Sequence, residues 1–202
     1  MIGYVIYKDT KLPYHIQTNK KLKNFYIQIH PELGVLVKNP NFSLQKVHDL
    51  VQSKAKWIYE KSLLLERREA LSNLYETEGK VLLFGQKQSL HVKKKLEDFY
   101  KEKTKEIVEP TLKKYSNLMD VYPTKVSYRK AKKRWGSCSG KNALSLNSSI
   151  AQLPLFCIEY IIIHELAHIK YKHHQKSFWN FVAKFCDYKK CEQEIKKYSP
   201  AF

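Results

Sequence analysis

Short stretches of alternating apolar and polar residues fill the first forty positions of the chain. Within residues 24–30, Phe25, Ile27 and Ile29 alternate with more polar neighbours, which is the period of a half-buried β-strand. Similar patterns predict four short strands, at residues 2–7, 13–18, 24–30 and 35–38. The simplest arrangement of four short strands that follow one another closely is an antiparallel β-meander.

A helical period replaces this alternation after residue 42. Ser43 is a good N-cap for a helix that runs to about Leu71, with apolar residues recurring along one face. A second strand pair is expected at residues 80–84 and 88–92. A further helix is expected from about Leu96 to Met119, and Pro110 should kink it or restart it.

A strand and a hairpin are predicted ahead of the C-terminal helices. Residues 123–130 have the pattern of a strand, and residues 133–149 that of a hairpin that turns at residues 139–142. In one interpretation the hairpin lines a cleft and an extended peptide pairs edge to edge with it. In the other, an ordinary hairpin packs Trp135 into the core, and spacing alone does not separate the two.

Two apolar helices are predicted to complete the chain. Pro154 suits the first turn of a helix that should end just after Lys170, and its first half, residues 155–163, is mostly apolar. A final helix is expected over residues 175–186. Its apolar face, which includes Phe178, should pack against the preceding helix.

The size and composition of the chain are those of a folded, soluble protein. Its 202 residues, 43% hydrophobic and 28% charged, fit one domain or two small ones. No stretch approaches the ~20 apolar residues of a membrane span, and the first residues lack the apolar run of a signal peptide. Four cysteines without a CxxC pair indicate reduced thiols. We therefore expect a cytoplasmic protein with no membrane partner.

The chain is strongly basic. Its formal net charge of +18 suggests attraction to nucleic acid or to other anionic partners through long-range fields. Lysine dominates, however, and no arginine-rich cluster with interleaved aromatic residues stands out. A solvated lysine coat is the alternative interpretation, so nonspecific nucleic-acid association is expected only as a secondary property.

The motif HELAH, residues 164–168, carries the candidate chemistry. On a helix, His164 and His168 lie on one face, one turn apart, and neutral imidazoles so placed can bind one zinc ion at roughly 2.0–2.1 Å. Glu165 can then act as general base on a water molecule that the metal makes acidic. The motif predicts a metallopeptidase, although a buried helix with core histidines gives the same five letters.

A third ligand must come from beyond the helix, because only two helix positions face the metal. His174 is close enough to fold back if the chain turns sharply, but Tyr171 stands where zincins of the HExxHxxGxxH type have the turn glycine. His173 could make the turn in a left-handed conformation, and it is also the rival ligand. Glu192 and Glu194 offer a ligand of a different type. The spacing favours His174 and leaves the others open.

Further motifs give the chain a resemblance to a known family. Together with HELAH, they resemble segments of the YgjP-like metallopeptidases, relatives of the SprT-like zincins with a minigluzincin-type fold. The resemblance covers the whole chain in layout. The segments are SKAKWI (53–58), RWGSCS (134–139), LSLN (144–147) and HHQKSFW (173–179).

The resemblance implies a site. By that likeness His164, His168 and His174 bind one Zn²⁺ and Glu165 is the catalytic base. Gln175 replaces the serine that is usual in the family, next to the third histidine.

The resemblance also implies an α+β fold. Its compact zincin core has a zinc helix, a backing helix and a short mixed sheet with an edge strand at the cleft, preceded by an N-terminal β-meander and helix. Residues 1–95 would form a strand-rich region with one long helix, and residues 96–202 the zincin-like catalytic domain. The hairpin at 133–149 would then include the strand that binds substrate.

The expected function is that of an HExxH zinc metalloendopeptidase acting on a peptide or protein substrate. The alternative is a basic nucleic-acid-associated protein whose zinc is structural, or whose protease activity is tethered to DNA. The sequence does not rank the candidates for oxyanion stabilisation, among them Tyr171, Tyr188 and the lysines. Substrate, cleavage specificity and oligomeric state are left open.

Overall fold

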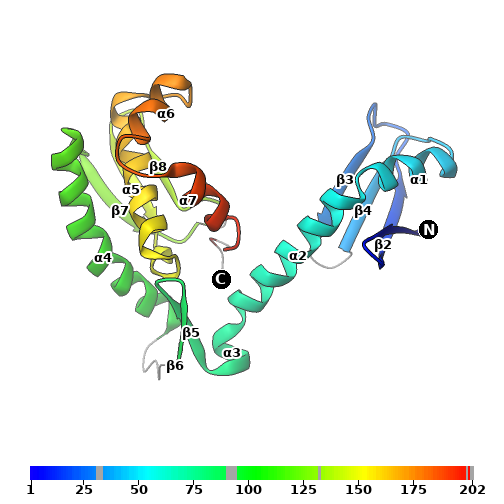
Figure 1. The fold of residues 1–202 in the computed structure, drawn as a ribbon, viewed down its shortest axis with the longest axis horizontal. Coiled ribbons are helices and arrows are strands. Elements are labelled where there is room, and N and C mark those ends of the chain that lie inside the picture. Colours follow the sequence, from blue (N-terminus) through cyan, green and yellow to red (C-terminus); the bar gives the residue numbers. More distant parts are fainter. Residues whose placement is uncertain (31–33, 90–94, 132, 199, 201–202) are drawn as a thin grey trace. The chain divides into compact units, whose positions relative to one another are not determined.

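The computed structural model describes residues 1–30, 34–89, 95–131, 133–198 and 200 of the chain (Figure 1). Runs of short strands and runs of helices follow one another along it, so the α+β class is confirmed. The chain divides into two compact units, Met1–Arg67 and Arg68–Phe202. Among the described residues, no helix combines the length and the hydrophobicity that crossing a membrane requires.

A four-stranded sheet forms most of the first unit. Its strands are β1 (Ile2–Tyr7), β2 (Thr10–Thr18), β3 (Tyr26–His30) and β4 (Gly34–Asn39), in the spatial order β1-β2-β4-β3. The four strands were correctly predicted, but the antiparallel meander was wrong, because β2 and β4 pair in parallel. Val35, Leu36 and Val37 are all buried, which explains why β4 takes a central position with a partner on each side.

The long helix predicted after Ser43 is in fact two helices. Ser43 caps the first, α1 (Leu44–Ser53), and its side chain accepts a hydrogen bond from the Lys46 amide. Lys54 interrupts the helix before α2 (Ala55–Ser72) begins. Apolar residues of both helices pack on the sheet in one core that includes Val5, Val37, Val47, Val51 and Ile58.

A small hairpin belongs to the second compact unit, and the predicted domain boundary at residue 95 stays a prediction. After α3 (Leu74–Glu78), strands β5 (Lys80–Leu83) and β6 (Gln86–Ser89) pair antiparallel, while residues 90–92 of the predicted strand lie outside the described residues. Leu82 is buried in the main core of this unit. The Tyr100 hydroxyl accepts a hydrogen bond from the Leu82 amide (3.0 Å) and donates one to its carbonyl (2.9 Å). These contacts join the hairpin to the rest of the second unit.

Helix α4 (Leu96–Met119) runs without interruption through Pro110, so the predicted restart does not occur. Proline removes the hydrogen bond to the carbonyl four residues earlier, that of Glu106. Both residues lie on the exposed side of the helix, where water can satisfy this carbonyl.

A short mixed sheet lies beside the helices of the second unit. Strands β7 (Lys125–Arg129) and β9 (Ala143–Asn147) pair in parallel, and β8 (Gly136–Cys138) pairs antiparallel with β9. The order β7-β9-β8 makes β8 an edge strand, as predicted for the hairpin. Leu144 and Leu146 of β9 are fully buried.

Helix α5 (Leu155–Lys170) forms the centre of the second unit. It packs against α4, against β8 and against the last two helices, α6 (Lys176–Val182) and α7 (Tyr188–Ile195) (Figure 1). Ile161, Ile162 and Ile163 are buried just ahead of the HELAH motif. Helix α5 ends at Lys170, as predicted. The final helix predicted over 175–186 is the shorter α6, and α7 follows it.

Candidate active site

The last two turns of α5 carry His164, Glu165 and His168. The apolar run before them anchors the helix in the core, and for that reason these side chains project from a rigid element. The two histidines are half-buried, and Glu165 is only 6% exposed. The HELAH segment is therefore helical and partly open to solvent.

His174 folds back onto the two helix histidines. Each of the three imidazoles offers one nitrogen, and the three nitrogens lie within 4.8 Å of one another. The Nε2 atoms of His164 and His174 are 3.1 Å apart. Tetrahedral ligands at 2.0–2.1 Å from a zinc ion are separated by about 3.3 Å. The donor set and its spacing fit a single metal ion of this kind.

The turn that brings His174 back is made in an unexpected way. The chain leaves α5 through Tyr171, which has an extended conformation (φ −127°, ψ 104°). The left-handed conformation suggested for His173 is wrong, since this residue is not among the described residues with positive φ. His173 is exposed and lies outside the histidine cluster; its Nδ1 accepts a hydrogen bond from the Gln175 amide (3.3 Å) at the start of α6.

Lys172 ties this turn to the β8–β9 hairpin. Its Nζ donates to Asn142 Oδ1 at 2.5 Å and to the Ser139 carbonyl at 3.1 Å. Nζ also lies 3.7 Å from the Cys138 sulfur. These contacts connect the loop that positions His174 to the tip of the β8–β9 hairpin.

Phe178 of α6 forms the floor of the histidine cluster. Its ring centroid lies 4.9, 4.6 and 4.8 Å from those of His164, His168 and His174, and its side chain is fully buried. Such packing restricts the ring positions. The sequence predicted that Phe178 packs on α5, but not that it contacts all three imidazoles.

Hydrogen bonds orient two of the three rings from behind. His168 Nδ1 lies 2.9 Å from the Tyr171 carbonyl, which can only accept, so Nδ1 carries the proton and Nε2 is left free. Burial lowers the pKa of His168, and it lowers that of His164 to about 3. Both imidazoles are therefore neutral at physiological pH, as metal binding requires.

A tyrosine connects His164 to one of the acidic residues considered as a third ligand. The Tyr160 hydroxyl lies 3.3 Å from His164 Nδ1 and donates to Glu192 Oε1 at 3.3 Å. The structure thus places Glu192 behind Tyr160 and outside the histidine cluster, while Glu194 pairs with Lys197. Sequence reasoning missed Tyr160, although its position four residues before His164 puts both on one helix face.

Glu165 lies in a tight, buried position against β8. A Cβ atom added to Gly136 would come within 2.6 Å of Glu165 Oε1. The other carboxylate oxygen, Oε2, is buried without a hydrogen-bond partner in the described part of the chain. Burial raises the pKa of Glu165 to about 7, and the nearby Arg134 partly opposes this shift. A carboxyl group of this kind can accept and release a proton near neutral pH.

Two cavities border His164 and Glu165. One, of about 350 Å³, reaches His168, His174 and Lys172, and the other, of about 460 Å³, extends toward Glu192 and Ile195. Arg134 and Gly136 line both. The candidate site therefore has open space on two sides, with β8 along its rim.

The two tyrosines considered for oxyanion stabilisation have other contacts. Tyr188 stacks on Trp179, with centroids 4.7 Å apart. The ring of Tyr171 packs against Phe181 at 5.6 Å and faces His173 at 6.1 Å. Neither lines the two cavities, whereas Lys172 lines the smaller one.

The protein belongs to the class of metallopeptidases with a zincin-like fold. Its central helix carries two histidines and a glutamate, and a third histidine and an edge strand lie next to them. Comparison with known proteins agrees. The model of the family described as "YgjP-like, metallopeptidase domain" matches residues 23–95 and 87–198. These matches cover most of the chain, and the chain therefore belongs to the YgjP-like metallopeptidase family, as its motifs predicted.

A solved structure with sequence similarity is the metallopeptidase zymogen of Pyrococcus abyssi abylysin. It is 28% identical over 43% of this chain and 86% of that chain, with a TM-score of 0.39. The comparison with curated proteins found no match.

Proposed function

We propose that this chain is a zinc-dependent endopeptidase. In this proposal His164, His168 and His174 hold one zinc ion, and Glu165 is the general base. The observation that carries it is a buried carboxylate oxygen without a partner among the described residues, beside three imidazoles whose nitrogens converge. Histidine nitrogens suit zinc, and a site with three protein ligands leaves a position for chemistry.

Each protein group then has a defined task. When bound, a zinc ion would supply Lewis-acid chemistry, polarising the scissile carbonyl and making a water molecule more acidic. Glu165 accepts a proton from the attacking water and delivers it to the leaving amine. The close contact with Gly136 keeps the carboxylate in place during both transfers.

The peptide would lie along the free edge of β8. The Trp135 carbonyl accepts a hydrogen bond from the Asn147 amide, and the Ser139 amide donates one to the Ala143 carbonyl. Bonded and non-bonded pairs alternate in an antiparallel ladder. The N–H and C=O groups of Gly136 and Cys138 therefore point away from β9. An extended peptide could pair with them as an added strand, next to Glu165.

Two sets of variants test this function. Glu165→Gln should retain one zinc ion per chain and lose peptide cleavage, since an amide cannot accept the proton. His174→Ala should lose zinc, whereas His173→Ala, changed at the neighbouring exposed residue, should retain it. Metal analysis and cleavage of a quenched fluorescent peptide library measure both effects. Cleavage retained by Glu165→Gln, or zinc retained by His174→Ala, would contradict the proposal.

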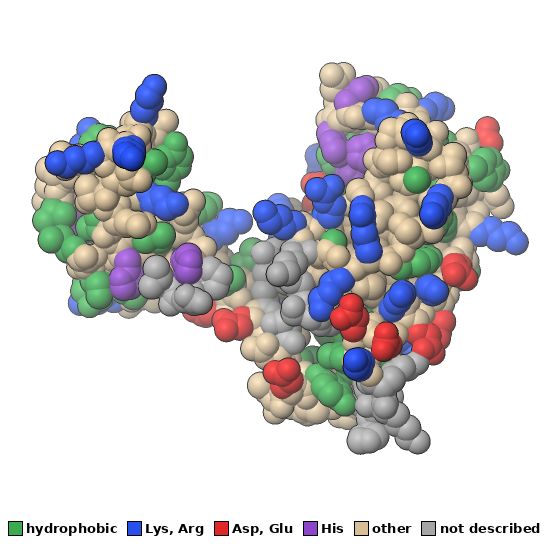
Figure 2. Space-filling model, turned by 180° about the vertical axis from the view of Figure 1, so that it is seen from behind, with side chains coloured by type: hydrophobic (Ala, Val, Ile, Leu, Met, Phe, Trp, Pro, Cys, Tyr) green, Lys and Arg blue, Asp and Glu red, His purple; other side chains and the backbone are tan. Residues whose placement is uncertain are grey.

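Nucleic-acid binding remains a secondary prediction, based on the net charge of +18. Figure 2 shows Lys and Arg side chains scattered over one face of the protein rather than gathered in a single patch. This pattern favours weak, nonspecific association that salt weakens steeply. A gel shift at near-physiological salt should show no stable complex, and a stable complex there would favour the DNA-tethered alternative.

A further inference from the structure

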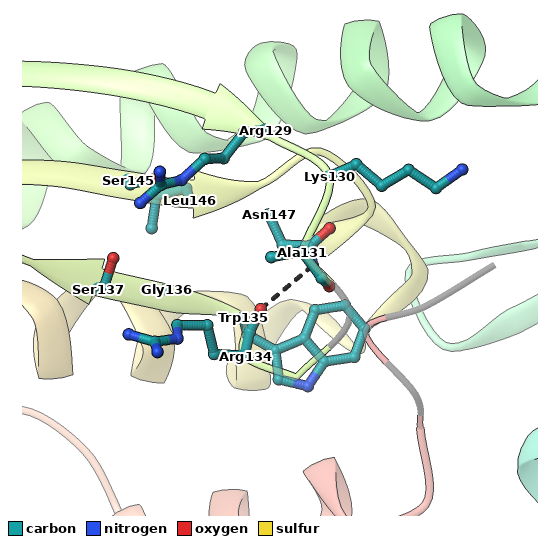
Figure 3. A pocket seen from close by; sticks show the side chains of 10 residues that line it. All are labelled: Arg129, Lys130, Ala131, Arg134, Trp135, Gly136, Ser137, Ser145, Leu146 and Asn147. Carbon is teal, nitrogen blue, oxygen red and sulfur yellow. Dashed lines mark hydrogen bonds between the residues drawn. The ribbon is translucent and has the colours of Figure 1, made fainter.

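A basic cavity lies beside the candidate active site, on the other side of β8. Its volume is about 330 Å³, and its lining includes three cationic side chains and two serines (Figure 3). These residues are Arg129, Lys130, Arg134, Ser137 and Ser145. No Asp or Glu is among the described residues that line it. The cavity therefore combines positive charge with hydroxyl groups.

Two of the three cations form no ion pair among the described residues, and one of these two, Arg134, also acts electrostatically on Glu165. Lys130 pairs with Glu97 at 3.3 Å, whereas Arg129 and Arg134 form no ion pair within the part of the chain that the structure describes. Figure 3 shows both guanidinium groups directed toward the same end of the cavity, with the Ser137 side chain between them in this view. Like charges around one cavity repel each other, and a bound anion would relieve that repulsion.

The basic cavity shares lining residues with the proposed catalytic site. Arg134 and Gly136 line this cavity and also both cavities that border Glu165. Gly136 faces Glu165, and side chains alternate along a strand, which places Ser137 on the opposite face of β8. Ser137 pairs with Ser145, so both serines share that face with the cavity.

We propose that this cavity is a specificity pocket for an acidic residue of the peptide substrate. The inference rests on the proposed function, in which the substrate pairs with β8. A substrate residue opposite Ser137 would direct its side chain to the same face as Ser137, toward Arg129 and Arg134. Guanidinium groups match a carboxylate in both charge and planar geometry. The substrate class is thus an extended peptide with Asp or Glu near the scissile bond.

Peptide pairs that differ by one charge test the pocket. In an otherwise neutral fluorescent decapeptide, Glu is moved through each position and compared with Gln there. We expect one position at which Glu raises kcat/KM about two- to fivefold, as suits partly exposed ion pairs. Arg129→Glu should abolish the preference for Glu over Gln, because it replaces one of the two guanidinium groups by an anion.

Lys125→Glu is the matched control. Lys125 lies on the same strand and face as Arg129, is also exposed and does not line the cavity, and both variants change the net charge equally. This control should keep the preference for Glu and the rate with the Gln peptide. Loss of the preference in Lys125→Glu would show a general charge effect and overturn the specific pocket.

A binding measurement separates this inference from the proposed function. Fluorescence anisotropy with zinc-loaded Glu165→Gln protein reports the affinity ratio of the Glu and Gln peptides without cleavage. If no peptide is cleaved by the wild type, the proposed catalysis fails, yet the affinity ratio still tests the pocket. Equal affinities at every position overturn the pocket. The pocket is also overturned if peptide charge has no effect while the protein binds a single-stranded oligonucleotide with an affinity that depends on Arg129.

Discussion

Replacing Gly136 by alanine should disable the site while leaving the histidine cluster intact. The added Cβ would lie 2.6 Å from Oε1, 2.7 Å from Cγ and 2.9 Å from Cδ of Glu165, whereas ordinary contacts lie at 3.4–4 Å. The carboxylate must therefore move by about 0.8 Å, the difference between 3.4 and 2.6 Å. Glu165 is buried, so its side chain has little room to comply.

The magnitude follows from this displacement. A misplacement of about 1 Å in a catalytic group can lower the rate about 100-fold, and we expect a loss of kcat of that order. Overpacking of a buried contact costs about 1–3 kcal/mol in the free energy of unfolding. The three atoms nearest to the new methyl group all belong to Glu165 and none to the three histidines, so zinc affinity should change little.

Gly140→Ala provides the control within the same hairpin. No atom lies within 4 Å of a Cβ added there, and Gly140 is not among the glycines with positive φ. Cleavage rate, zinc content and denaturant unfolding are measured for both variants. Wild-type kcat and unchanged stability in Gly136→Ala would refute the proposed contact between β8 and Glu165.

Two other substitutions test the contacts that support the site and the fold. Tyr160→Phe removes the hydroxyl between His164 and Glu192. It should weaken zinc binding about tenfold in a chelator competition. An unchanged zinc affinity would show that the hydroxyl does not orient the imidazole of His164. Tyr100→Phe leaves the buried backbone groups of Leu82 without a partner and should cost about 1–3 kcal/mol of unfolding free energy in urea titrations. Burial raises the pKa of Tyr100 to about 12 from its usual 10.0. The contribution of this phenol to the free energy of unfolding is therefore complete below pH 10 and is lost as the pH rises through about 12. The phenylalanine variant should lack this part of the loss of stability at alkaline pH.

Much of the second unit could be predicted from local sequence. The apolar run ahead of His164 and the HELAH spacing predict a buried helix with two histidines on one face, and α5 has both properties. The pairing of β2 with β4 could not be predicted, because it depends on which strand is most buried after all four assemble. The route to His174 was also missed, since a left-handed conformation was suggested for His173, whereas His173 has no positive φ and the chain leaves α5 through an extended Tyr171.

The contacts that surround the site were less predictable than the site itself. Tyr160 and Glu192 are 32 residues apart, and their hydrogen bond arises only after α7 packs on α5. A glycine within a strand, such as Gly136, indicates that another group approaches closely, but the sequence does not identify that group as Glu165. Such long-range contacts depend on tertiary packing, which short sequence patterns do not encode.

The three contacts of Lys172 have a mechanical consequence. They join the segment that presents His174 to the tip of the β8–β9 hairpin. A peptide that docks on β8 and displaces this tip must either break the contacts of Lys172 or pull the third histidine along with it. Binding of a strand at the rim would thus be transmitted directly to the geometry of the three imidazoles, through a single flexible side chain.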